Sequence, residues 1–211
     1  MRDSLGGPPV TRTEATIDVL IVIGACAAYV FLEAFQVPKR WSFLAMGLIL
    51  AAYTVYLATR RTDSWHGFGF RTDNFRTGLL PIGLFTLIGA GAIVGIGVWQ
   101  GRTAWGSKAL ILLSLYPVWA LAQQFAFQGV LHRRLMLLVR SPALQVLITS
   151  VAFASVHFGN RLLFALTFVA GIAWSFIYRR WPNLWLLAGS HSILAALAYP
   201  LVLADAPLSR L

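Results

Sequence analysis

The sequence is divided into apolar stretches that are each about as long as a membrane is thick. Seven stretches stand out among the 211 residues, and they are 17–37, 41–59, 79–99, 109–131, 142–160, 161–178 and 183–203. A helix needs about 20 apolar residues to cross the hydrocarbon core of a bilayer. Charged residues make up only 11% of the chain, against about 25% in soluble domains, which excludes a soluble multidomain protein. We therefore expect an all-α, polytopic transmembrane bundle of about seven spans, forming a single integral membrane domain over residues 1–211.

Basic pairs separate these stretches and predict how the chain is oriented. The sequence holds 17 Lys and Arg against 7 Asp and Glu. The pairs are Lys39-Arg40, Arg60-Arg61, Arg133-Arg134 and Arg179-Arg180. Cations placed between apolar stretches orient helices at anionic lipid surfaces, so the expected partner is membrane lipid and not nucleic acid. More of these cations fall on the N-terminal side of the expected bundle than on the opposite side, which predicts a cytoplasmic N-terminus.

Two other segments are expected to shape the bundle. Residues 79–99 are rich in glycines at small-xxx-small spacing, which permits close helix packing. This pattern favours packing within the chain. The alternative is that these glycines contact a second copy of the chain in a homo-oligomer. The loop 60–78 carries Arg, Gly and aromatic residues, and we expect it to form a collar at the membrane interface.

Polar side chains concentrate in the fourth, fifth and seventh stretches. They are Gln123, Gln124 and Gln128; Ser150 and His157, with Phe153 between them; and Ser190, His191 and Ser192. Polar groups at membrane depth are costly and mark candidate functional sites. Two histidines and three glutamines on three helices favour a shared polar cavity. Structural hydrogen bonding between helices is the alternative.

The residue types in these stretches do not form a familiar metal site or nucleophile. Catalytic zinc takes three protein ligands, whereas these stretches supply two histidines and no carboxylate. Glu33, late in the first stretch, is the only acid that could approach, and its position indicates an interface residue instead. Cys26 and the serines have no obvious base and acid arranged around them. We expect no metal and no cofactor.

Three short segments, taken in order, resemble a known family. Residues 123–131, 153–157 and 191–195 resemble the three motifs of the CPBP family, which are Glu-Glu-x-x-x-Arg, Phe-x-x-x-His and His-x-x-x-Asn or Asp. This family contains the type II CAAX prenyl endopeptidases and bacterial relatives linked to bacteriocin processing and self-immunity. The resemblance covers about residues 65–203.

The resemblance implies an intramembrane endopeptidase, located in the bacterial inner membrane. In this family, a glutamate assisted by a histidine activates water, and the last motif's histidine and asparagine stabilise the oxyanion. Phe153, His157 and His191 match these motifs. Their implied roles are those of the family's corresponding residues.

Four motif positions depart from the family pattern. Gln123 and Gln124 replace both glutamates, Gln128 replaces the arginine and Ala195 replaces the asparagine. A carboxamide cannot take a proton from water, and alanine offers no oxyanion donor. Exchanging acid and base together removes buried charge without leaving an unpaired partner.

These departures predict a pseudoprotease that binds a membrane-embedded or lipidated peptide. One alternative is an active endopeptidase that works through His157 and His191. A second alternative is a small transporter or channel, supported only by the cationic loops and the glycine-rich third stretch.

Overall fold

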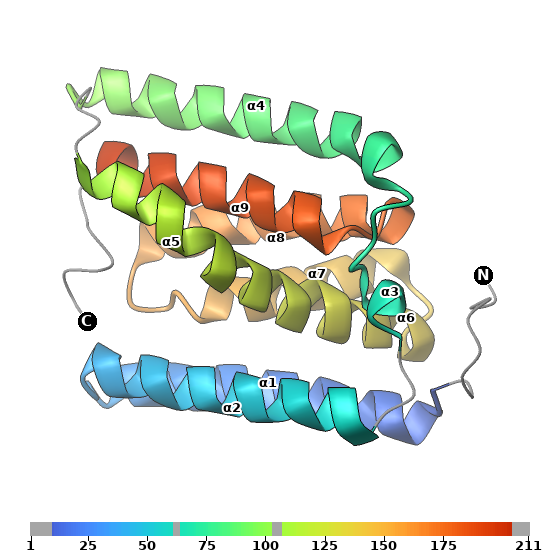
Figure 1. Ribbon diagram of the computed structural model, residues 1–211. Helices are drawn as coiled ribbons and strands as arrows, with labels where there is room; N and C mark the ends of the chain where they lie inside the picture. The colour runs from blue at the N-terminus through green and yellow to red at the C-terminus, as the bar shows by residue number, and fades with distance from the viewer. Residues whose placement is uncertain (1–9, 61–63, 103–106, 204–211) are drawn as a thin grey trace.

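The computed structural model describes residues 10–60, 64–102 and 107–203, and these residues form long helices that run alongside one another (Figure 1). In chain order the elements are α1 (Arg12–Ala34), α2 (Lys39–Arg60), α3 (Trp65–Phe68), α4 (Phe75–Trp99), α5 (Ser107–Gln124), the π-helix η1 (Phe125–His132), α6 (Arg133–Leu138), α7 (Pro142–Ser155), α8 (Arg161–Arg180), α9 (Leu184–Ala198) and the π-helix η2 (Tyr199–Leu203). The all-α class expected from the sequence is confirmed.

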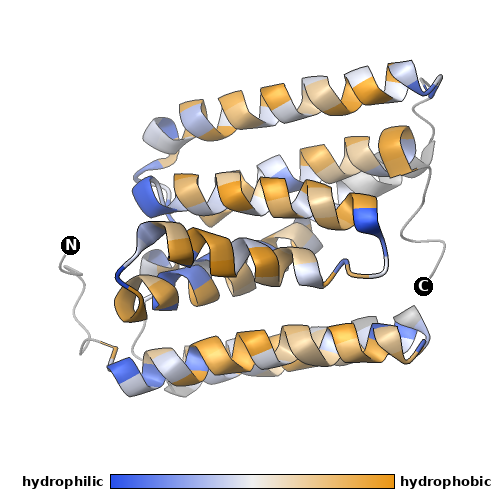
Figure 2. Ribbon diagram, turned by 180° about the vertical axis from the view of Figure 1, so that it is seen from behind, coloured by the Kyte–Doolittle hydropathy of each residue, from blue (hydrophilic) through white to orange (hydrophobic). Residues whose placement is uncertain are grey.

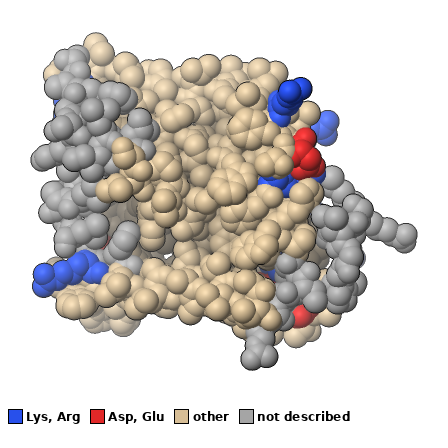
Figure 3. Space-filling model, in the orientation of Figure 1, with Lys and Arg blue, Asp and Glu red and all other residues tan. Residues whose placement is uncertain are grey.

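Five helices are long and apolar enough to cross a membrane: α1, α2, α4, α8, and α9 extended through Leu203. Helix α7 has 14 residues and is only about 21 Å long at a rise of about 1.5 Å per residue, short of the ~30 Å hydrocarbon core. The helices are apolar in their middle and hydrophilic at their ends (Figure 2). The charged side chains visible on one face also lie at the two ends (Figure 3). The protein is therefore an integral membrane protein with five candidate spans among the residues that the structure describes, and the count of seven stays a prediction.

Helix α9 is the central helix of the bundle. In its apolar window 67% of the residues are buried, against 17–33% in the other four candidate spans. It packs against α4 where α4 lacks side chains: a Cβ added to Gly89 would lie 3.1 Å from Leu194, and one added to Gly97 would lie 3.0 Å from Leu201. These two glycines of the third stretch therefore serve packing within the chain.

The segment expected as an interfacial collar is partly built into the core. Phe68 is buried, and its carbonyl accepts a 2.6 Å hydrogen bond from the hydroxyl of Tyr178 in α8. Gly69 follows with φ +103°, a conformation that favours glycine, and its carbonyl accepts from the backbone N–H of Leu184 at 2.8 Å. The ring of Phe68 also packs on Phe125 at 5.3 Å between centroids. Helix α3 thus fixes the starts of η1 and α9.

Side-chain caps set where the last three long helices begin. The side chains of Ser141, Asn160 and Asn183 accept hydrogen bonds from backbone N–H groups at the starts of α7, α8 and α9. Pro142 occupies the first turn of α7, where its missing N–H costs nothing. These caps fix the register of the helices that carry Phe153, Trp174 and His191.

Candidate functional site

The ring of Phe153 joins the fourth, fifth and seventh apolar stretches. From α7 it contacts Phe127 of η1 at 5.1 Å, His191 of α9 at 5.5 Å and Trp174 of α8 at 5.7 Å, all between ring centroids. His157 lies 6.2 Å from the same ring. The two motif histidines therefore converge on one aromatic side chain.

The imidazole of His191 is enclosed by aromatic rings from three helices. Trp174 lies 4.8 Å away, and Phe153 and Tyr116 each lie 5.5 Å away. The hydroxyl oxygen of Tyr116 is 3.5 Å from Nε2 of His191. The side chain is 3% exposed, and its Nδ1 makes no hydrogen bond to any residue in the described ranges. One nitrogen of this histidine is thus left for a polar partner from outside the described structure.

Gln123 lies on the face of α5 that points at this site. It follows Tyr116 by seven residues and precedes Phe127 by four, so the three share one helix face. Tyr116 contacts His191, and Phe127 contacts Phe153. Gln123 is consequently placed between these two contacts. Its side chain is buried, and its Oε1 has no hydrogen-bond partner among the residues that the structure describes.

Gln124 and Gln128 occupy the adjoining face, and each is 1% exposed. Gln128 Nε2 donates to Ser175 Oγ in α8 at 3.0 Å. Its Oε1, and both polar atoms of the Gln124 amide, lack a hydrogen-bond partner within the described parts of the chain. Leaving a buried polar group unsatisfied costs about 1–3 kcal/mol. A site with several such amide atoms is suited to a ligand that carries its own donors and acceptors.

The backbone changes its winding at these residues. The π-helix η1 begins immediately after Gln124 and extends over the third motif glutamine, Gln128. Segments of π-helix are rare and occur frequently at functional sites. No feature of the sequence predicted this one.

His157 lies in the turns that follow α7. Its backbone N–H donates to Ala154 at 2.9 Å, and its carbonyl accepts from Asn160 at 2.9 Å. Two residues further on, Gly159 is covered by the carboxylate of Glu33 from the end of α1, and any side chain at position 159 would collide with that carboxylate. The structure therefore places an acid beside the turn that carries His157, where the sequence had favoured an interface role for it.

Ala195 follows His191 by one turn of α9 and is buried together with Tyr199, with Tyr116 packed against the two. Position 195, which the resemblance aligns with the family's asparagine, is thus filled by an apolar side chain packed between aromatic rings. Tyr116, whose hydroxyl approaches His191, was missed in the sequence. The only signal for it was its spacing of seven residues from Gln123.

The serines that drew attention in the sequence are occupied in structural hydrogen bonds. Ser190 accepts from Trp174 Nε1 at 3.0 Å and shares a 2.7 Å hydrogen bond with the Thr86 hydroxyl of α4. Ser192 and Ser150 donate to backbone carbonyls of their own helices. The contacts of Ser190 therefore join α9 to α4 and α8, whereas those of Ser150 and Ser192 lie within their own helices.

No group of three or more His, Cys, Asp and Glu side chains that could hold a metal ion occurs within residues 10–60, 64–102 and 107–203. The arrangement offers buried amide groups, the imidazole of His191 enclosed by aromatic rings, and the imidazole of His157 beside the ring of Phe153. These groups can form hydrogen bonds, and the imidazoles can transfer protons.

Comparison with known proteins identifies one family. Residues 105–197 match the family model described as type II CAAX prenyl endopeptidase Rce1-like. This segment contains every motif position considered above, from Gln123 to Ala195. The resemblance found in the sequence is confirmed over these residues. No curated protein and no solved structure matches the chain.

Proposed function

We propose that this chain, a CPBP-family membrane protein by its residues 105–197, binds a membrane-embedded or lipidated peptide at the His191 site without cutting it. One observation carries the proposal. The amide of Gln124, which the resemblance aligns with a glutamate of the family, is buried with neither polar atom hydrogen-bonded to a residue of the described ranges.

A glutamine amide is suited to holding a peptide backbone. It presents one carbonyl acceptor and an NH₂ donor, and a peptide bond presents the complementary pair. Gln123 and Gln128 add further acceptor oxygens on the same helix. An amide is also neutral, so holding it in a low-dielectric site avoids the desolvation cost of a buried carboxylate. These features support binding as the present role.

The same substitutions argue against hydrolysis. Cleaving an amide requires a base that takes a proton from water and donors that hold the oxyanion. Neither Gln123 nor Gln124 can act as that base, and Ala195 presents only a methyl group.

Photo-crosslinking tests the proposal directly. The purified protein in lipid nanodiscs is incubated with a farnesylated peptide that carries a photoreactive group, and mass spectrometry measures both adduct and cleavage. We expect an adduct and intact peptide. Gln124→Ala should lower the adduct yield about 2–10-fold, because a hydrogen bond of about 0.5–1.5 kcal/mol is lost. The control is Gln100→Ala, since Gln100 is exposed at the end of α4. Cleaved peptide, or equal losses in both variants, would contradict the proposal.

A second candidate is hydrolysis through His157 and His191, and the position of Glu33 favours it. A carboxylate beside the His157 turn is the kind of group that orients and charge-balances a histidine base. If the protein cuts the peptide, this candidate requires His157→Ala to abolish cutting and Glu33→Gln to reduce it. Asp73→Asn, at an exposed acid outside the site, should leave cutting unchanged.

A further inference from the structure

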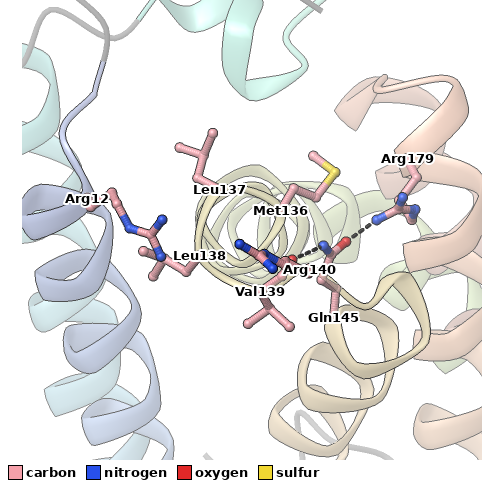
Figure 4. Close-up of a pocket in the computed structure, with 8 residues that line it drawn as sticks. All are labelled: Arg12, Met136, Leu137, Leu138, Val139, Arg140, Gln145 and Arg179. Carbon is pink, nitrogen blue, oxygen red and sulfur yellow. Dashed lines mark hydrogen bonds between the residues drawn. The ribbon is translucent and has the colours of Figure 1, made fainter.

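A hollow lies at the end of the bundle where α1 and α7 begin and α6 and α8 end. It is a cavity of about 400 Å³ with an open mouth, and four of its lining residues are polar: Arg12, Arg140, Gln145 and Arg179 (Figure 4). The rest of its wall is the apolar stretch Met136 to Val139. Gln145 and Phe153 are eight residues apart on α7, or about 12 Å along the helix. The cavity is therefore separate from the histidine site.

Three arginines from different segments surround this cavity. Arg12 opens α1, Arg140 lies in the loop between α6 and α7, and Arg179 lies in the last turn of α8. In Figure 4 the Arg12 side chain extends from α1 toward the end of α6 that leads to Arg140. None of the three forms an ion pair with an acidic side chain within the described residues. Like charges gathered in this way repel one another, and an anion between them would relieve the repulsion.

One of these arginines is held in place by a buried amide. Gln145 is 4% exposed; its Oε1 accepts from Arg179 Nη1, and its Nε2 donates to the Val139 carbonyl at 2.6 Å. This bridge fixes Arg179 against the loop that carries Arg140. A fixed guanidinium loses less entropy when it binds, and its planar donors match the oxygens of a phosphate.

We propose that this cavity binds the phosphate headgroup of an anionic phospholipid. The cavity lies at an end of the candidate spans, where helices that cross the hydrocarbon core meet the lipid headgroups. Part of its wall is basic and part is apolar, and Leu137 in the apolar part is half exposed. A site for a headgroup with its acyl chain requires both kinds of surface. Basic pockets between transmembrane helices recognise anionic headgroups. A free phosphate would match the arginines and leave the apolar wall unused.

Ligand-dependent thermal stability tests this assignment. The protein in a neutral detergent is titrated with short-chain phosphatidylglycerol, short-chain phosphatidylcholine or inorganic phosphate, and tryptophan fluorescence gives the midpoint of unfolding. We expect phosphatidylglycerol to raise the midpoint, because a ligand that binds the folded state stabilises it, and we expect the other two ligands to leave it unchanged.

Single-charge variants locate the site. Arg12→Gln and Arg140→Gln should each weaken phosphatidylglycerol binding roughly five-fold, the fold-change that corresponds to about 1 kcal/mol per basic residue. Arg76→Gln is the matched control, because Arg76 is exposed in the first turn of α4 and does not line the cavity. Arg179→Gln also removes the bridge to Gln145, so the comparison of Arg140→Gln with Arg76→Gln is decisive.

Three results would overturn the proposal. An equal shift with inorganic phosphate would identify a soluble anion as the ligand, and an equal shift with phosphatidylcholine would remove the need for a negative charge. An equal loss in Arg76→Gln and Arg140→Gln would assign binding to general surface charge.

Discussion

Asp18 of α1 and Arg134 of α6 form a 2.8 Å ion pair in which both side chains are fully buried. The guanidinium also lies 5.4 Å from the ring centroid of Phe68 in α3. Helix α6 directly continues α5 and η1, which carry the motif glutamines. The ion pair therefore connects the N-terminal helix α1 to the helical segment that carries these glutamines.

Removing one partner of this pair should destabilise the protein strongly. Asp18→Asn removes the buried carboxylate that the Arg134 guanidinium contacts, and we expect a loss of about 3–5 kcal/mol in the free energy of unfolding. Replacing both partners with apolar residues, Asp18→Leu with Arg134→Met, should recover most of that loss, because no uncompensated charge remains. Unfolding in detergent, followed by tryptophan fluorescence, measures both variants.

The exposed pair Arg71–Asp73 provides the control for this experiment. Its carboxylate is half exposed, and exposed pairs contribute little to stability. Asp73→Asn should therefore change the unfolding midpoint far less than Asp18→Asn. Equal losses of stability in the two variants would show that the buried Asp18–Arg134 pair stabilises the protein no more than the exposed pair does.

The buried pair also illustrates what the sequence could not show. In the sequence, Arg134 is recognisable only as part of a basic pair between apolar stretches, and no acid is identifiable as its partner. Asp18 and Arg134 are 116 residues apart, and no local pattern links an acid to a base at that distance. The all-α class could be predicted, since the lengths of the apolar stretches and the positions of the basic pairs between them are local properties of the sequence.

The candidate site was predictable to a similar extent. The motif residues His157 and His191 were identified from type and spacing, whereas Tyr116 and Trp174 were not, because aromatic residues are common throughout apolar helices. The role of Glu33 beside Gly159 depends on how α1 packs against the turn after α7. Such contacts between helices are set by tertiary packing and leave no periodic signal in the sequence.

The pH dependence of stability should reveal the Asp73 cluster. A hydrogen bond from Arg71, together with the charges of Arg71 and His66, holds the pKa of Asp73 well below its usual range. A carboxylate whose pKa is lowered by folding stabilises the folded state fully above its unfolded-state pKa of about 4. That contribution is lost as the pH falls through the lower folded-state value. The stability difference between the wild type and Asp73→Asn should be present at about pH 5 and should shrink below about pH 4. A difference that stays constant down to pH 2 would contradict this assignment.

Orientation in the membrane is a separate prediction. The excess of Lys and Arg on the N-terminal side predicts a cytoplasmic N-terminus and seven spans. The start of α1 and the end of α9 lie at opposite ends of the bundle (Figure 1), which is consistent with an odd number of crossings. Reporter fusions in the 60–78 loop and after residue 211 should therefore report opposite sides, cytoplasmic and external. Both reporters on one side would exclude the seven-span arrangement.

Restoring the family's residues should reveal whether the site retains a catalytic geometry. The unmodified protein should show no detectable cleavage of farnesylated or transmembrane peptides. Loss of a general base typically costs about 10²–10⁴ in rate, and loss of an oxyanion donor costs about a further 10²–10³. The variant Gln123→Glu, Gln124→Glu, Gln128→Arg and Ala195→Asn should gain measurable turnover. The gain should be partial, because an asparagine at 195 must displace the packing of Tyr116 and Tyr199.

Substitutions made one at a time test whether the introduced charges must be present together. Gln128 is buried and bonded to Ser175, so Gln128→Arg alone places an unpaired charge in the core and should lower the yield of folded protein. Adding Gln124→Glu, one helical turn away, should recover that yield by supplying a counter-charge. Turnover in the restored protein should vanish when His191→Ala is added. If instead the unmodified protein cuts a peptide and His157→Ala or His191→Ala abolishes the cutting, hydrolysis does not need the glutamates, and the second candidate function replaces the first.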